Sequence, residues 1–245
     1  MTASKPRWDL LGYLRNHRFD EDRWNPSEDA QWRELVSVGN DGIISSAAIV
    51  QGLLTAGATG QEAVTGVLAL IAIGMVASGA SQYSESESER QSQLSIVERE
   101  SAALLATPDE EFDELVAIYM DKGLSADLSR AVATELMEKD ALTAQLDAEY
   151  GLDSIHGKWW PWQRAGLAAL VFLVGSVLPL LFLLILPWAV RGEVTVAAVV
   201  IALGISGWIG HLVDHSSAWR AMARTVLVGV TILGISTLAG TLVTF

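Results

Sequence analysis

The run AGLAALVFLVGSVLPLLFLLILPWAV, residues 165–190, contains no charged residue and sets the class of the fold. A helix that crosses the hydrocarbon core of a bilayer needs about 20 mostly apolar residues. Four more uncharged runs of similar length lie at 42–61, 63–84, 194–210 and 225–245. Together the five runs predict an all-α, five-span transmembrane helical protein.

The run at 42–61 is the least hydrophobic of the five, because Ser45, Ser46, Thr55, Thr59 and several glycines interrupt its apolar residues. Small residues let helix backbones approach closely in lipid, where packing replaces the hydrophobic driving force. We therefore expect this span in the interior of the helix bundle.

Composition supports a membrane protein and excludes several kinds of site. Hydrophobic residues make up 51% of the 245 residues, and the mean hydropathy is +0.34. Cysteine is absent, which excludes disulfide bridges and thiolate metal ligands. The chain has no Gly-rich loop followed by Lys-Ser/Thr, no Ser-His-Asp pattern and no zinc-protease motif. We therefore expect no enzyme, no ATP-driven pump, no required cofactor and no nucleic-acid partner.

The distribution of basic residues predicts the orientation in the membrane. Residues 1–36 lack the apolar core of a signal peptide and are expected to form an amphipathic segment at the interface. With that segment inside, fifteen of the sixteen Lys and Arg residues fall on the cytoplasmic side and only Arg191 falls outside. Because loops rich in Lys and Arg stay in the cytoplasm, we expect a multi-pass protein of the inner (plasma) membrane with a cytoplasmic N-terminus.

An acidic block separates the second and third runs. Residues 85–153 hold eighteen Asp or Glu against five Lys or Arg. Apolar residues recur there at helical spacing, and Thr107-Pro108 and Lys122-Gly123-Leu124-Ser125 are helix boundaries. These signals predict a three-helix cytoplasmic domain inserted between spans two and three, with helices at 85–106, 108–121 and 125–149, the first continuing the second span. The predicted organisation is an amphipathic segment at 1–36, spans one and two at 37–84, the acidic domain at 85–155 and spans three to five at 156–245.

Several carboxylates of the acidic block are spaced to share a helix face. Glu111 and Glu114 are three residues apart, as are Glu135 and Glu138, and Glu149 lies near the end of the third predicted helix. Divalent cations bind where several oxygens converge, and carboxylates on facing helices form such sites in metal-binding bundles. The alternative is that these acids are the solvated faces of an ordinary amphipathic bundle. A smaller candidate cluster between the last two spans consists of His211, Asp214 and His215.

Six stretches carry a further pattern: Asn40-Asp41-Gly42-Ile43-Ile44-Ser45, Gly79-Ala80-Ser81-Gln82-Tyr83, residues 109–119, Lys122-Gly123-Leu124, the segment from Leu136-Met137 to Asp140-Ala141-Leu142, and Gly175-x-x-x-Pro179-Leu180. In this order they resemble the vacuolar iron transporter family, whose members move ferrous iron or manganese out of the cytosol. The similarity covers about residues 36–245.

The resemblance implies a homodimer with its pore between the subunits and with ion entry from the cytoplasmic helical domain. Carried over by position, it implies Asp41 as the pore carboxylate. The metal ligands that it implies in the cytoplasmic domain are Glu100, Glu111, Glu114 and Glu149. An acid at the start of a span also caps the helix and complements its dipole, so Asp41 has a structural alternative.

The second span departs from the family pattern Ser-Met-Ala-x-Gly-Glu-Tyr. Ser78 stands where Met is expected and Gln82 where Glu is expected, and Ala103 replaces a second acid of the cytoplasmic domain. Met75 lies seven residues before Gln82, about two helical turns, so both share a face and can serve as soft and neutral-oxygen ligands. The alternative for Met75 is an apolar gap filler.

We therefore predict a transporter that exports Fe²⁺ or Mn²⁺ from the cytosol by proton exchange, with the ion as cargo and not as a cofactor. One alternative is a membrane-anchored metal-binding or sensing protein that does not transport. Another is a structural membrane protein whose acidic bundle binds no metal. The residues predicted to contact the metal are Glu100, Glu111, Glu114, Glu135, Glu138, Glu149, Asp41, Met75 and Gln82.

Overall fold

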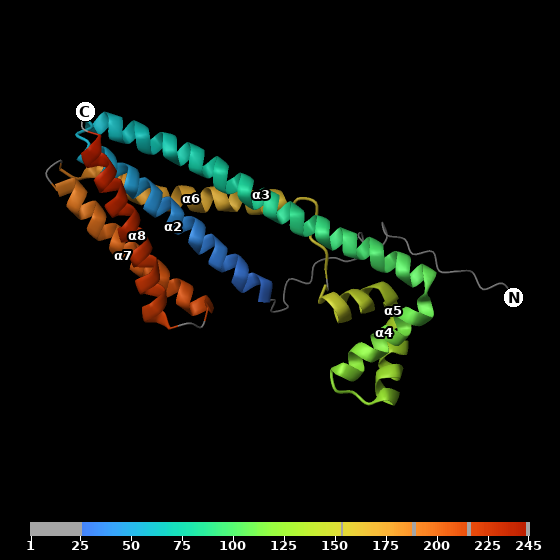
Figure 1. Ribbon diagram of the computed structural model, residues 1–245. Helices are drawn as coiled ribbons and strands as arrows, with labels where there is room; N and C mark the ends of the chain where they lie inside the picture. Colours follow the sequence, from blue (N-terminus) through green and yellow to red (C-terminus); the bar gives the residue numbers. More distant parts are fainter. Residues whose placement is uncertain (1–25, 153, 188–189, 215–216, 244–245) are drawn as a thin grey trace. The chain divides into compact units, whose positions relative to one another are not determined.

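All the regular secondary structure in the described part of the chain is helical, which confirms the all-α prediction (Figure 1). The computed structural model describes residues 26–152, 154–187, 190–214 and 217–243, with only the backbone described at 26–30 and 212–214. Most of the predicted amphipathic segment at 1–36 thus lies outside the described residues. The seven described helices are α2 (Pro26–Thr55), α3 (Gly60–Ala106), α4 (Pro108–Asp121), α5 (Ala126–Tyr150), α6 (Trp160–Ile185), α7 (Arg191–Asp214) and α8 (Ala218–Leu242).

The helices form two compact units. Residues 85–160 make up one, here called the acidic unit; residues 26–84 and 161–243 make up the other, the membrane unit. Helix α3 belongs to both, because it continues without a break from Gly60 to Ala106. The prediction that the first helix of the acidic block continues the second span is therefore confirmed.

Four helices in the described residues are long and apolar enough to cross a membrane: α3, α6, α7 over Arg191–His211, and α8. These correspond to the second through fifth predicted spans. Helix α2 is not among them, because Pro26–Thr55 combines part of the uncharged run with a charged and polar first half. The chain is a multi-pass membrane protein with four such helices in its described part.

The predicted bounds of the first span are wrong. Helix α2 begins at Pro26, well before the uncharged run at 42–61, and ends at Thr55 inside that run. The chain then turns at 56–59, where Gly57 has a φ of 85° and the Ala58 amide donates to the Leu53 carbonyl at 2.9 Å. Helix α3 starts with a capping box, because the Thr59 amide and hydroxyl donate to Glu62 at 2.7 and 2.8 Å. The uncharged run therefore contains a helix end, a turn and a helix start.

Helix α2 packs against α7 and α8 in the membrane unit. Its buried side chains Ile44 and Ala47 form a cluster with Val199 and Leu203 of α7 and Leu233 of α8. The Ser176 hydroxyl of α6 donates to the carbonyl of Gly42 at 3.2 Å, and a Cβ on Gly42 would meet the backbone of α6. The small residues of α2 thus permit close backbone contact, which is their expected use in lipid.

The acidic unit contains the three predicted helices with nearly the predicted bounds. Helices α4 and α5 start after Thr107 and Ser125, the boundary residues recognised in the sequence. The sequence predicted one uninterrupted helix at 125–149, but α5 breaks at Asp140, where the backbone is extended with a φ of −162° and a ψ of 93°. The Asp140 carboxylate accepts hydrogen bonds from the Thr143 amide at 3.2 Å and hydroxyl at 2.8 Å. Asp140 therefore caps a second helical segment, which brings Leu142 and Leu146 into the core with Val97 and Leu104.

Candidate metal-binding site

The acidic unit holds a buried carboxylate with other carboxylates around it. Glu111 of α4 is 8% exposed and Glu100 of α3 is 5% exposed, although both are acids. Burial raises the pKa of Glu111, and the negative charges of Glu100, Glu114, Glu149 and Glu110 raise it further. Three of these neighbours are the positions implied by the family resemblance. The structure thus brings Glu100, Glu111, Glu114 and Glu149 near one another, from three helices.

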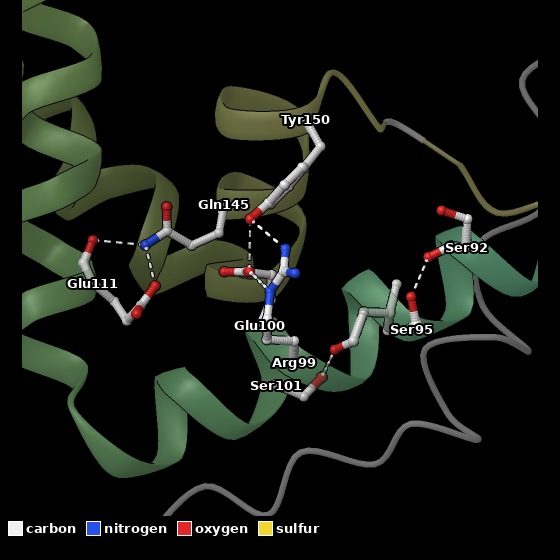
Figure 2. A network of polar contacts seen from close by, with 9 residues as sticks. Ser92, Ser95, Arg99, Glu100, Ser101, Glu111, Gln145 and Tyr150 are labelled. Carbon is white, nitrogen blue, oxygen red and sulfur yellow. Dashed lines mark hydrogen bonds and ion pairs between the residues drawn. The ribbon is translucent and has the colours of Figure 1, made fainter.

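Glu100 is held by two neighbouring side chains (Figure 2). The Tyr150 hydroxyl donates a hydrogen bond to Glu100 Oε1 at 3.0 Å, and Arg99 Nε lies 3.5 Å from the same oxygen. Arg99 Nη2 also donates to the Tyr150 hydroxyl oxygen at 2.7 Å. Burial raises the pKa of Tyr150 to about 12, with hydrogen bonds to Glu149 and Glu100 adding to the effect. Tyr150 therefore stays protonated at neutral pH and remains a donor to the carboxylate.

Glu111 is held by Gln145 of α5, which has no exposed surface. Gln145 Nε2 donates to the Glu111 carbonyl at 2.6 Å and to Glu111 Oε2 at 3.1 Å, as Figure 2 shows. Gln145 Oε1 is buried and has no hydrogen-bond partner among the described residues. An amide oxygen is an accepted ligand of hard divalent cations. Gln145 and Tyr150 were not predicted from the sequence. The available signal was a Gln on the apolar helix face that carries Leu142 and Leu146.

The carboxylates do not converge on one point. Among the described residues, no group of three or more His, Asp or Glu side chains lies close enough to hold a metal ion. Glu114 and Glu149 are exposed, whereas Glu100 and Glu111 are turned to Tyr150 and Gln145. In this conformation the four acids form a concentrated negative charge around a buried carboxylate, not a closed coordination shell.

Glu135 and Glu138 differ from the other four acids. Both are exposed on α5, and neither is among the charges that act on Glu111. Their spacing places them on one helix face, but that face is open to solvent. The structure therefore gives no support for their participation with Glu111.

Asp41 lies in the membrane unit, exposed in the wall of a cavity of about 290 Å³. Helices α2, α7 and α8 line this cavity, and its other polar groups include Arg33, Ser37, Asn40, Ser206 and Arg224. The alternative that Asp41 caps the first span is wrong, because α2 begins fifteen residues earlier at Pro26.

Met75 and Gln82 of α3 have different surroundings. Met75 packs against the apolar cluster that contains Val67, Ile71 and Leu183, and it lines an apolar groove of about 470 Å³ between α3 and α6. Gln82 is 5% exposed, with its amide nitrogen donating to Glu34 and its amide oxygen accepting from Arg164 at 3.4 Å. The partners Glu34 and Arg164 were not predicted from the sequence, because nothing in the local pattern indicates which helices meet there.

The second candidate cluster is only partly described. His211 lies on α7, but the side chain of Asp214 and all of His215 are outside the described residues. The structure therefore gives no geometry for this cluster.

Comparison with known proteins identifies the family of the chain. The profile of the VIT family matches residues 32–241, which is most of the chain. The chain is 27% identical over 213 residues to "Vacuolar iron transporter" of Acanthamoeba castellanii, covering 82% of this chain and 78% of that protein. It is 26% identical over 202 residues to "Vacuolar iron transporter 1" of Arabidopsis thaliana, covering 80% of each. The chain therefore belongs to the VIT family, a family of membrane transporters and not of enzymes.

Proposed function

We propose that this protein exports Fe²⁺ or Mn²⁺ from the cytosol in exchange for protons. The observation that carries the proposal is the buried Glu111, surrounded by Glu100, Glu114 and Glu149 in the acidic unit of a VIT-family chain. The relatives named above are iron transporters by name. Manganese and proton exchange extend beyond those names.

The acidic unit is proposed to collect the ion. A dication among four carboxylates relieves their mutual repulsion and provides the charge partner that the buried Glu111 lacks. Oxygen ligands then come from α3, α4 and α5, and the Gln145 amide oxygen is a further candidate. Because Tyr150 and Arg99 contact the Glu100 carboxylate, the proposal has Glu100 turn from Arg99 toward Glu111 when the ion binds.

The membrane unit is proposed to pass the ion across the bilayer. Asp41 is the proposed pore carboxylate, in a homodimer whose subunits share the pore, and Met75 and Gln82 remain predicted ligands of the same path. In this proposal α2 is the fifth membrane-crossing helix and the acidic unit and the N-terminus face the cytoplasm. Fifteen of sixteen Lys and Arg residues then lie on the cytoplasmic side of the plasma membrane. Glu135 and Glu138 remain predicted contacts without support from the geometry.

A second candidate function is metal binding or sensing without transport. The specific observation in its favour is that residues 63–84 of α3 contain no Asp, Glu, His, Lys or Arg. Gln82, at the position where the family pattern has Glu, is instead engaged by Glu34 and Arg164. A second span without an acid has no carboxylate of its own to exchange protons.

Uptake into proteoliposomes separates the two candidates. We expect wild-type protein to transport Mn²⁺ and Fe²⁺, and Asp41→Asn to bind Mn²⁺ as wild type does but to lose flux. Glu111→Gln is expected to weaken binding, and Glu98→Gln is the matched control, since Glu98 is an exposed acid of the same unit and not a predicted metal contact. Binding without flux in wild type would favour the sensing protein. Absence of Mn²⁺ and Fe²⁺ binding, measured by calorimetry on the full chain, would contradict both candidates.

A further inference from the structure

A buried guanidinium joins three helices of the membrane unit. Arg164, one turn into α6, is 8% exposed. Its Nη2 atom lies 2.7 Å from Glu34 Oε2 of α2 and 3.4 Å from Gln82 Oε1 of α3. Its Nη1 atom donates to Gln31 Oε1 of α2 at 3.3 Å. An arginine cannot lose its proton in a protein, so this buried site always carries a positive charge that its neighbours must balance.

Gln82 closes these contacts into a ring. Its amide nitrogen donates to Glu34 and its amide oxygen accepts from Arg164, while Arg164 and Glu34 form an ion pair. Each of the three residues therefore has at least two partners within the ring. A glutamine fits this position because it offers one donor group and one acceptor group. A glutamate would place a second carboxylate against Glu34, and an apolar residue would leave both neighbours one hydrogen bond short.

The ring lies close to the helix segment that carries Asp41. Glu34 is seven residues before Asp41 on α2, a rise of about 10 Å along the helix. Just beyond Asp41, Gly42 is held against α6 by the Ser176 hydroxyl. The segment with Asp41 is thus fastened to α6 on both sides, by the ring before it and by the Gly42 contact after it.

We propose that Arg164, Glu34 and Gln82 form a positioning ring that fixes α2 against α3 and α6 and thereby holds Asp41 in the wall of its cavity. Arg164 is a positioning residue in this assignment and does not contact the ion. The functional part rests on the proposed transport role of Asp41. The positional part does not, since it concerns only where α2 lies.

The absence of cysteine from the chain permits a direct test of the position of α2. Ser37 is exposed in the same cavity as Asp41, one turn after Glu34. In a Ser37→Cys background we compare Arg164→Gln with Arg220→Gln, an exposed arginine at the start of α8. The readouts are the rate of thiol modification by a water-soluble maleimide and the initial rate of Mn²⁺ uptake by proteoliposomes. A Thr134→Cys variant reports on the exposed surface of the acidic unit.

Opening the ring releases α2, so Arg164→Gln is expected to raise the Ser37→Cys modification rate at least about threefold and to lower uptake about tenfold. Arg220→Gln is expected to change neither rate. Thr134→Cys, made without Ser37→Cys, is expected to react at the same rate alone and combined with Arg164→Gln or Arg220→Gln. Mn²⁺ binding by the full chain should be unchanged, which separates a displaced Asp41 from a damaged acidic unit.

Gln82→Leu provides a second variant in case Arg164→Gln does not fold. It opens the ring but keeps the ion pair of Arg164 with Glu34, so it is expected to change both rates in the same direction by a smaller factor. Modification and uptake rates within twofold of those of the Ser37→Cys protein, for a folded Arg164→Gln and for Gln82→Leu in that background, would overturn the proposal. If wild type shows no uptake, the proposed transport function fails, while the modification rates still decide whether the ring positions α2.

Discussion

Replacing Gln145 with Glu tests how Glu111 is held in the acidic unit. The Gln145 amide nitrogen donates to the Glu111 carbonyl at 2.6 Å and to its carboxylate at 3.1 Å. In Gln145→Glu an oxygen replaces that nitrogen, so two hydrogen bonds become oxygen–oxygen contacts and a second charge is buried beside Glu111. A buried charge without a partner costs about 3–5 kcal/mol. Gln145→Leu removes only the hydrogen bonds and is expected to cost about 1–3 kcal/mol.

Hydrogen–deuterium exchange of α4 and α5 in the detergent-solubilised full chain measures this difference locally. In metal-free buffer near pH 7 we expect faster exchange in Gln145→Glu than in Gln145→Leu, and faster exchange in both than in wild type. Mn²⁺ at about 100 times its Kd stabilises a binding-competent state by about 2.7 kcal/mol. It should therefore restore Gln145→Glu, which gains a ligand oxygen, more than Gln145→Leu. Equal exchange in the two variants without metal, or no recovery of Gln145→Glu with Mn²⁺, would refute the reasoning.

Substitutions at Glu111, Tyr150 and Gly42 perturb the acidic unit and the membrane unit separately. Burial and nearby acids raise the pKa of Glu111 in the folded protein above its ordinary value of 4.5. The stability that Glu111 contributes is therefore complete below pH 4.5 and is lost as the pH rises through the raised pKa of the folded protein. Glu111→Gln should therefore become more stable than metal-free wild type as pH rises toward neutral, which melting curves at several pH values check. Tyr150→Phe removes the hydroxyl donor to Glu100 and should destabilise the metal-free unit by about 1.5–3 kcal/mol, measured by the same exchange experiment; unchanged exchange would contradict it. Gly42→Leu places a side chain against the backbone of α6 and should abolish the monodisperse peak in size-exclusion chromatography, whereas Gly166→Leu, whose Cβ meets nothing within 4 Å, should elute as wild type does.

The helix boundaries of the acidic unit could be predicted because they are set by local chemistry. Pro108 fits the first turn of a helix, where its missing amide hydrogen is not needed. Gly123, with a φ of 99°, ends α4 in a conformation that favours glycine. The break at Asp140 carries no Gly or Pro signal. Its extended backbone is accompanied by hydrogen bonds from Thr143 and by packing of the segment that follows.

The candidate site was predictable only in part from spacing. Spacing of three residues places two acids on one helix face but does not say whether that face meets a neighbouring helix. Glu111 is buried against Gln145 of α5, whereas Glu114, on the same helix, and Glu135 and Glu138 of α5 are exposed. The ring formed by Arg164 depends on the tertiary packing of three helices, which no local sequence pattern indicates.

The first span was misplaced because the absence of charge was used to define its start. Helix α2 begins before the uncharged run and includes Glu34 and Asp41. The charge of Glu34 is balanced by Arg164 of α6. A helix can therefore extend through charged residues when its partners come from elsewhere in the chain, and hydropathy alone does not show this.

The four-residue turn between Thr55 and Gly60 has a consequence for biogenesis. Helix α2 is not apolar enough by itself to qualify as a spanning helix, whereas α3 is. So short a link keeps the two helices together as they leave the ribosome. We expect the translocon to receive them as a helical hairpin, in which the more hydrophobic α3 drives insertion and α2 inserts together with it.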